Sequence, residues 1–276
     1  MPEALETRPS KDEVVALLAE EWGSIDRLVS GLSDQEWSTP ALPGWDVHDV
    51  LAHIVGTERM LSGVEPPPIT EGTDEGAHVH NPIGQSNERW IVGLRSRSHG
   101  ELLSDFREVT ADRLQTLRSM PEEEFRAPSW TPAGQADYGR FMEIRIFDCY
   151  VHEQDIRGAL GRPGHEGGPV AEMALREVTL ALGYIVGKRV GASEGDRVTI
   201  DLTGPIERSL HVVVDGRARV VPTLEGAPTA SITLPSPLFL RLAAGRVEPG
   251  SVADQVARSG DAELSERLAG NLAFTI

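Results

Sequence analysis

The segment Ile146-Phe-Asp-Cys-Tyr-Val-His-Glu-Gln-Asp-Ile-Arg157 sets two polar residues, Asp148 and His152, four positions apart in an apolar helical pattern. At about 100° per residue, both side chains fall in one helix stripe roughly 80° wide. The same stripe contains Phe141, Ile144, Asp155 and Ala159. It therefore faces the interior, where a carboxylate and an imidazole are costly to bury unless a partner such as a divalent cation satisfies both.

The helix that carries this segment is expected over residues 137–160, because Gly161-Arg-Pro-Gly164 is a strong C-terminal signal. Three more amphipathic helices are expected earlier in the chain, at residues 11–32, 47–61 and 85–120. Asp46 is the expected N-cap of the second helix, and the third is either continuous or interrupted at His99-Gly100. Four such helices with one long connection predict a four-helix bundle, whose facing helices can hold a metal site.

His53 lies at the edge of the core stripe of the second helix, where it is placed to face a cavity, whereas His48 points the opposite way. With Asp148 and His152 it gives two imidazoles and one carboxylate from two helices. This donor set is typical of zinc or another borderline divalent ion, and three protein ligands leave a position open for water or substrate. The alternative is that Asp148 and His152 form a hydrogen-bonded pair in the bundle interior without a metal.

The residues beside this pair are interpreted from their helical positions. Asp155, one turn beyond His152, either orients the imidazole ring or forms a salt bridge with an arginine of a packed helix. Cys149 lies about 100° round the helix from Asp148, which favours core packing over metal binding. Glu153 is expected to point away from the site.

Residues 62–82 are rich in glycine and proline, so they are expected to form a surface excursion or a lid. His78 and His80 in this segment would bind a metal only if the loop folds over the site, and a solvated loop is favoured. The sequence contains no Gly-x-Ser-x-Gly nucleophile motif and no Gly-rich phosphate loop. These absences argue against a hydrolase and against a nucleotide-dependent enzyme.

After residue 191 the pattern changes to alternation, as in Val198, Ile200 and Leu202, which is typical of strands. Further strands are expected at residues 210–214, 219–221 and 231–234, and further helices at residues 170–190, 237–244 and 252–268. We therefore predict an α+β protein, with a four-helix bundle over residues 1–165 followed by a smaller mixed α/β domain over residues 166–276. The helix at 170–190 belongs to either domain.

The net charge of −17 over 276 residues argues against nucleic-acid binding, because the basic residues form no block to offset it. No apolar run is long enough to cross a bilayer, and the start of the sequence does not resemble a signal peptide. We therefore expect a cytoplasmic monomer or small homo-oligomer without membrane contact. Cys149 is the single cysteine, which excludes an intrachain disulfide and a cysteine-rich zinc site.

Two stretches resemble signatures of the DinB-like, mycothiol-dependent maleylpyruvate isomerase family. Trp45-Asp-Val-His-Asp-Val-Leu-Ala-His53 is similar to the signature of its second helix. Asp148-Cys-Tyr-Val-His-Glu-Gln-Asp-Ile-Arg157, followed by Leu160-Gly-Arg-Pro163, is similar to that of its fourth helix. The rest of the chain resembles the family's sterol-carrier-protein-like C-terminal domain through Leu242-Ala-Ala-Gly-Arg246.

The resemblance implies that His53, Asp148 and His152 bind a divalent metal, usually zinc, although the characterised isomerase has Glu where this chain has Asp148. It also implies that mycothiol, the low-molecular-weight thiol of actinobacteria, is a co-substrate. The metal would lower the pKa of the thiol and so produce a strong nucleophile at neutral pH. The implied reactions are the isomerisation of maleylpyruvate or the transfer of the thiol to another electrophilic small molecule.

A carboxylate-bearing substrate would need an arginine, whose planar fork pairs with both oxygens. Arg246, Arg145 and Arg89 are the candidates, and Arg246 is preferred as the catalytic residue. Each of them is alternatively a surface or interdomain salt bridge. The competing hypothesis is a non-catalytic module that binds a small molecule or a partner, with a structural metal or none.

Overall fold

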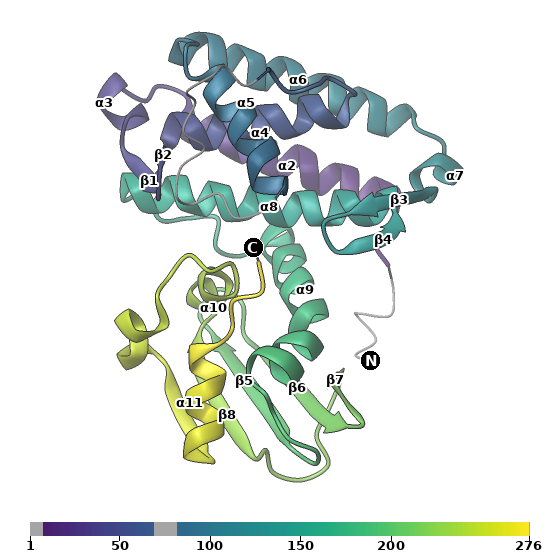
Figure 1. Cartoon of the computed structure of the whole chain (residues 1–276), viewed down its shortest axis with the longest axis vertical. Helices are drawn as coiled ribbons and strands as arrows, with labels where there is room; N and C mark the ends of the chain where they lie inside the picture. Colours follow the sequence, from purple (N-terminus) through teal and green to yellow (C-terminus); the bar gives the residue numbers. More distant parts are fainter. Residues whose placement is uncertain (1–7, 69–81, 276) are drawn as a thin grey trace. The chain divides into compact units, whose positions relative to one another are not determined.

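The computed structural model describes residues 8–68 and 82–275, which contacts within the chain divide into two compact units. One unit is Lys11–Gly164, and the other combines Met1–Ser10 with His165–Ile276. The first is mainly helical, and the second packs helices against a sheet (Figure 1). The predicted α+β class is confirmed. Within the described part of the chain, no helix is both long and apolar enough to cross a membrane.

Four long helices form the core of the first unit. They are α2 (Lys11–Val29), α4 (Val47–Leu61), α6 (His99–Ser119) and α8 (Tyr138–Leu160). Helix α2 packs against α6 and α8, and α4 packs against the same two helices, so the four surround one interior (Figure 1). Helix α5 (Pro82–Leu94) packs on the outside of α4. The predicted four-helix arrangement is therefore present.

The ends of the two site-bearing helices follow from local hydrogen bonds. The Asp46 side chain accepts from the backbone N–H of Asp49 and starts α4, and Asp137 does the same for Arg140 at the start of α8. Helix α8 ends at Gly161, whose φ of 62° is a left-handed conformation that glycine adopts without strain. These signals act over three or four residues, so the sequence predicts both helices with nearly correct bounds.

The helix expected over residues 85–120 is interrupted, which was one of the two alternatives, and forms α5 and α6. Ser98 and Glu101 form a capping box that starts α6 at His99. Two connections between the long helices contain short elements. The connection between α6 and α8 contains α7 (Glu122–Phe125) and strand β3 (Pro128–Thr131), which pairs with β4 (Gly134–Asp137). The loop before α4 contains α3 (Asp34–Trp37), β1 (Pro40–Leu42) and β2 (Trp45–Asp46). Elements of two to four residues are too short to show an apolar period.

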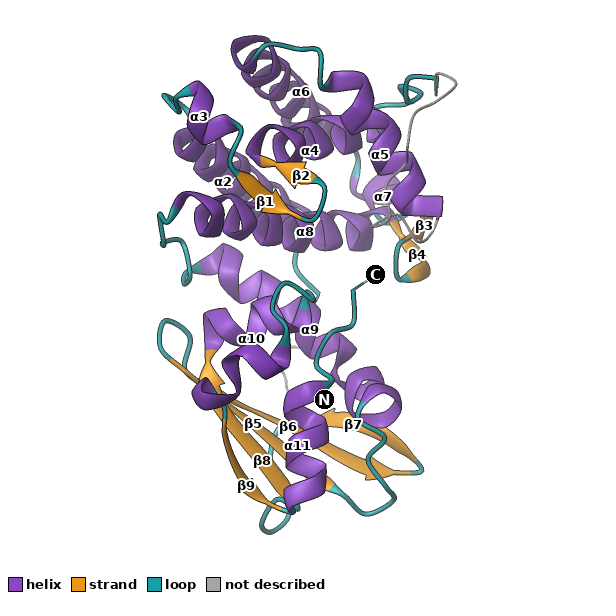
Figure 2. Cartoon of the chain, turned by 60° about the vertical axis from the view of Figure 1, so that its left-hand side comes forward, coloured by secondary structure: helices purple, strands orange, loops and turns teal. Residues whose placement is uncertain are grey.

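The second unit is built on a five-stranded sheet of order β7-β6-β5-β8-β9, in which only β5 and β8 are parallel (Figure 2). The strands are β5 (Arg197–Thr203), β6 (Arg208–Asp215), β7 (Arg217–Val221), β8 (Ala230–Pro235) and β9 (Ala257–Gly260). Packed against it are α9 (Pro169–Tyr184), α10 (Ser236–Ala243) and α11 (Ala262–Gly270). The alternating Val198, Ile200 and Leu202 are buried.

One prediction for the second unit is wrong. Residues 252–268, expected to be helical, contain the end of a 3-10 segment (Pro249–Gln255), the edge strand β9 and most of α11. Strand β9 is exposed along its whole length, so no alternation of apolar residues marks it. The helix expected at residues 170–190 is α9, which continues into a π-helical turn at Ile185–Arg189 and belongs to the second unit.

Candidate metal centre

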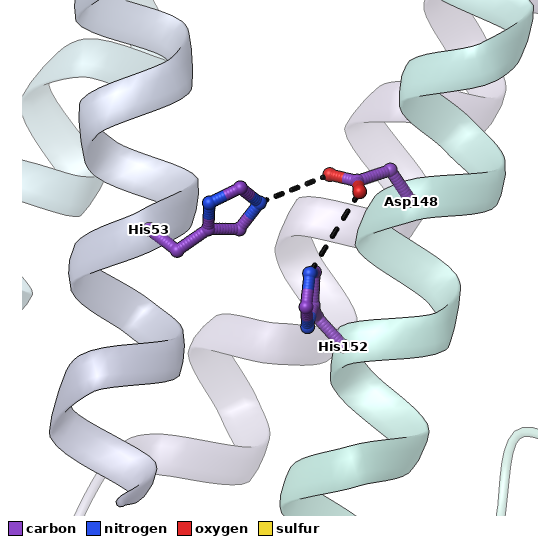
Figure 3. Close-up of side chains that lie close together, drawn as sticks. All are labelled: His53, Asp148 and His152. Carbon is purple, nitrogen blue, oxygen red and sulfur yellow. Dashed lines mark hydrogen bonds and ion pairs between the residues drawn. The ribbon is translucent and has the colours of Figure 1, made fainter. Parts of the chain in front are cut away.

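The structure brings His53 of α4 together with Asp148 and His152 of α8 (Figure 3). His53 Nε2 lies 3.4 Å from Asp148 Oδ2, and His152 Nε2 lies 3.7 Å from Asp148 Oδ1. One ligand atom from each of the three residues lies within 4.8 Å of the other two. Residues 95 positions apart in the sequence therefore present two ring nitrogens and a carboxylate to one point.

The packing of α4 against α8 places this group in the bundle interior. Both histidines are 4% exposed, whereas the side chain of Asp148 is 33% exposed. Val50 and Ile54 of α4 are fully buried and fix the face on which His53 lies. The three residues, which we call the metal cluster, are thus surrounded by packed side chains and open to solvent on the side of Asp148.

Each member of the metal cluster is held in a form that binds cations. Burial lowers the pKa of His53 to about 4 against the opposing effect of Asp148, so its imidazole is neutral at neutral pH. Burial alone would raise the pKa of Asp148, but the Arg145 guanidinium and the two histidines outweigh it and hold that pKa well below its usual value. His152 Nδ1 lies 3.1 Å from Asp155 Oδ2, which turns Nε2 toward the centre.

The donor set and its spacing fit a divalent metal ion. Zinc lies about 2.0–2.1 Å from its nitrogen and oxygen ligands, so adjacent ligand atoms of a tetrahedral site are about 3.3 Å apart. The 3.4 and 3.7 Å separations in the metal cluster are close to that value. Three protein ligands would leave a fourth position for a second molecule, as catalytic zinc sites do.

An aromatic side chain that the sequence reasoning did not single out lies beside the metal cluster. The Trp45 ring centroid is 5.4 Å from that of His53 and 6.0 Å from that of His152. Its Nε1–H donates to Glu88 Oε2 over 3.1 Å, and Glu88 is buried on α5. Trp45 therefore forms an apolar wall next to the donor atoms, fixed by a hydrogen bond from a third helix.

Comparison with known proteins assigns the chain to a family. The mycothiol maleylpyruvate isomerase N-terminal domain model matches residues 18–157, and the model of the C-terminal domain of the same family matches residues 172–267. The chain belongs to the mycothiol maleylpyruvate isomerase family. The first match contains the whole metal cluster, and the second contains Arg246.

The fold is similar to that of solved structures described as mycothiol-dependent maleylpyruvate isomerase. One such crystal structure aligns with a TM-score of 0.56, and that of a histidine-to-alanine mutant aligns with a TM-score of 0.57. In both cases 18% of residues are identical, and the alignment covers 91% of this chain and 93% of the other. At this identity the likeness supports the fold. No curated protein sequence matches the chain.

The arginines predicted to bind a substrate carboxylate have different surroundings. Arg145 is buried and donates to Glu58 and Asp148, so it is not available to a substrate, and that candidate is withdrawn. Arg89 donates to backbone carbonyls at residues 66–67. Arg246 lies in the second unit, where Nη1 donates to the carbonyl of Ala244. Its catalytic role stays a prediction.

Cys149 and Glu153, two further sequence candidates, are buried but do not belong to the metal cluster. Cys149 is fully buried, and burial raises the pKa of its thiol, which makes it a poor nucleophile. Glu153 points away from the cluster as expected, but it is buried, and its carboxylate accepts from Ser24 Oγ over 2.6 Å. His78 and His80 lie outside the described residues.

Proposed function

We propose that this chain binds one divalent metal ion, zinc, through His53, Asp148 and His152, and uses mycothiol to isomerise maleylpyruvate. The convergence of three donor atoms within 4.8 Å of one another, inside the matched N-terminal domain, is the observation that carries the proposal. The names of the similar solved structures support the choice of thiol and substrate.

A divalent metal at this position supplies a Lewis acid that lowers the pKa of a thiol reaching its open position. The residues of the chain prepare the site for that chemistry. His53 is neutral and Asp148 is ionised, so neither has to lose a proton before binding, and Asp155 orients the His152 ring. The Trp45 ring provides an apolar surface that limits access of water to one side of the donor atoms.

The reaction follows from the chemistry of the two small molecules. The thiolate adds to the electron-poor double bond of maleylpyruvate, which leaves a single bond about which the adduct rotates. Expulsion of the same thiolate restores the double bond in the trans arrangement, so the thiol is regenerated and no atom is gained or lost. The buried Cys149 takes no part, and the sulfur comes from the diffusible thiol. Arg246 is our choice for pairing with a substrate carboxylate.

The direct test is the absorbance change of maleylpyruvate in the presence of purified protein and mycothiol, before and after treatment with a chelator. We expect turnover that needs both thiol and metal, with the free thiol concentration unchanged at the end. Stoichiometric loss of free thiol with other electrophiles, and no isomerisation, would instead make the protein a thiol S-transferase. No metal-dependent turnover with any thiol would contradict the proposal and favour a binding protein.

A further inference from the structure

A buried ion-pair network connects the metal cluster to the opposite side of the bundle. Glu58 of α4 has a side chain only 1% exposed, and each of its oxygens receives a guanidinium. Arg145 Nε and Nη2 donate to Oε1 over 3.0 and 2.9 Å, and Arg113 Nε of α6 donates to Oε2 over 3.1 Å. One carboxylate thus joins three helices of the bundle.

Arg145 carries this network to the metal cluster. Its third nitrogen, Nη1, donates to Asp148 Oδ2, one helical turn along α8. The Arg145 side chain is 3% exposed, so its position is set by packing as well as by its two carboxylate partners. The planar fork therefore spans from Glu58 on one helix to the predicted metal ligand on another.

The charges explain why Arg145 stays in this place. Two guanidinium groups, Arg113 and Arg145, share Glu58, and the Asp148 carboxylate supplies the second negative charge. A buried guanidinium without a partner is strongly unfavourable, so the Asp148 carboxylate is needed by Arg145 as much as by a metal. Asp148 Oδ2 accepts from Arg145 Nη1 and lies 3.4 Å from His53 Nε2, whereas Oδ1 lies 3.7 Å from His152 Nε2.

We infer that Arg145 is a positioning residue for the metal: clamped by Glu58, it holds Asp148 Oδ2 and so fixes the carboxylate in the orientation that faces His53 and His152. This inference rests on the metal site of the proposed function and extends it. Asp148 is the most exposed member of the metal cluster, so without Arg145 its carboxylate would have the greatest freedom to rotate. A rotated or two-oxygen carboxylate would occupy the coordination position intended for the thiol.

The test compares Arg145→Lys with Arg113→Lys in the full chain loaded with Co²⁺ or Zn²⁺. Both arginines are buried and share Glu58, but only Arg145 contacts Asp148, so Arg113→Lys is a matched control for the loss of stability. Lysine keeps the charge but cannot reach two carboxylates as a fork does. Metal affinity is measured by competition with a chromophoric chelator, and coordination by the visible absorption of bound Co²⁺.

We expect Arg145→Lys to weaken metal binding about ten- to a hundredfold, the effect typical of residues that hold a metal ligand. Its Co²⁺ absorption should also change in shape and lose intensity, as happens when the coordination number rises. Arg113→Lys should leave the affinity within about threefold of wild type, with the same Co²⁺ spectrum, because its contacts do not include a ligand. Unchanged affinity and spectrum in Arg145→Lys, or equal changes in both variants, would overturn the inference.

A second variant keeps the inference testable if Arg145→Lys does not fold. Glu58→Gln keeps an oxygen for one arginine but removes the charge that clamps Arg145, so it should shift the Co²⁺ spectrum in the same direction by a smaller amount. If Arg145→Lys does not fold, an unchanged spectrum in Glu58→Gln overturns the inference. Absence of metal from the wild-type protein would contradict the proposed function itself, which separates that failure from this one.

Discussion

Helix α8 presents two buried polar clusters to two neighbouring helices. Their surroundings shift the pKa of a carboxyl group in opposite directions. Toward α4 it presents the metal cluster, where Asp148 is held ionised beside Arg145. Toward α2 it presents Glu153, which lies beside Glu21, and we call these two residues the carboxylate pair. Burial and the nearby Glu153 raise the pKa of Glu21 well above its ordinary value of 4.5. His152 and Glu153 are adjacent in the sequence, but a turn of about 100° sends them to different surroundings.

Burial alone does not decide whether a carboxyl group stays charged. In the carboxylate pair, Glu153 accepts from Arg157 and Ser24, and burial beside Glu153 raises the pKa of Glu21. In the metal cluster a guanidinium keeps Asp148 charged, and two imidazoles complete a donor set. The neighbouring cations thus help to decide which buried carboxyl group stays charged.

The largest effect is expected from removing the shared anion of the network. Glu58→Leu leaves the buried guanidinium groups of Arg113 and Arg145 without their common partner, and breaking such a pair costs about 3–5 kcal/mol of unfolding free energy. Urea unfolding followed by circular dichroism measures it. Glu122→Leu, which removes an exposed carboxylate that pairs with the half-buried Arg126, should cost less than about 1 kcal/mol. Equal costs would contradict the account.

A smaller effect is expected from the residue that orients His152. Asp155→Asn keeps the size of the side chain but removes the negative charge that favours a Nδ1–H toward it. Zinc affinity, measured by competition with a chelator, should fall about tenfold, at the lower end of what such partners contribute. An affinity equal to that of wild type would show that packing alone orients the imidazole.

Neutralising Glu21 of the carboxylate pair should stabilise the protein, whereas neutralising Asp155 should weaken metal binding. Because the folded pKa of Glu21 is raised, its stabilising contribution is present below its ordinary pKa of 4.5 and is lost as pH rises through the raised value. Glu21→Gln mimics the protonated form, so it should be more stable than wild type at about pH 8, by on the order of 1 kcal/mol or more, and equal to it at about pH 4.

The neighbouring exposed residue provides the control for that measurement. Glu20→Gln changes the same charge on the same helix, at a position that is open to solvent. Chemical unfolding across the pH range should show no comparable gain. Destabilisation by Glu21→Gln at high pH would mean that the carboxylate pair functions ionised, and the contrast with the metal cluster would fail.

The smallest effect is expected at Cys149, which lies between the two clusters in the sequence. Its thiol is fully buried with a raised pKa, so a thiol reagent should leave the native protein unmodified over a time that labels the urea-unfolded protein completely. Cys149→Ala should keep the mycothiol-dependent activity. Loss of that activity with normal metal content would place the reactive sulfur in the protein.

The long helices and the three metal-cluster residues follow from the sequence because their signals are local. Asp46, Asp137 and Gly161 mark helix ends, and the spacing of Asp148 and His152 places both on one face. The contact between Arg145 and Glu58 joins residues 87 positions apart, so no local pattern reveals it. From the sequence, Arg145 is one of three candidates for binding a substrate carboxylate, with a salt bridge as the alternative. Trp45 was likewise visible only as part of a family signature, without a reason for its position.

The edge strand β9 and the hairpin of β3 and β4 show a second limit of prediction from the sequence. Their stability depends on pairing with a partner strand, and their own residues carry no apolar alternation. Glu153 shows a third limit. Helical geometry correctly predicts that its side chain points away from the metal cluster, but it does not predict that α2 buries it. Directions are set by the helix itself, whereas burial is set by the elements that pack against it.

The central claim is that His53, Asp148 and His152 together bind a metal, and elemental analysis of purified proteins tests it most directly. Wild type and Glu21→Gln should each carry about one divalent metal ion per chain, and His53→Ala should carry almost none, because two ligands from one helix cannot hold the ion. Normal metal content in His53→Ala, with the metal absent from Glu21→Gln, would place the ion at the carboxylate pair and contradict the assignment.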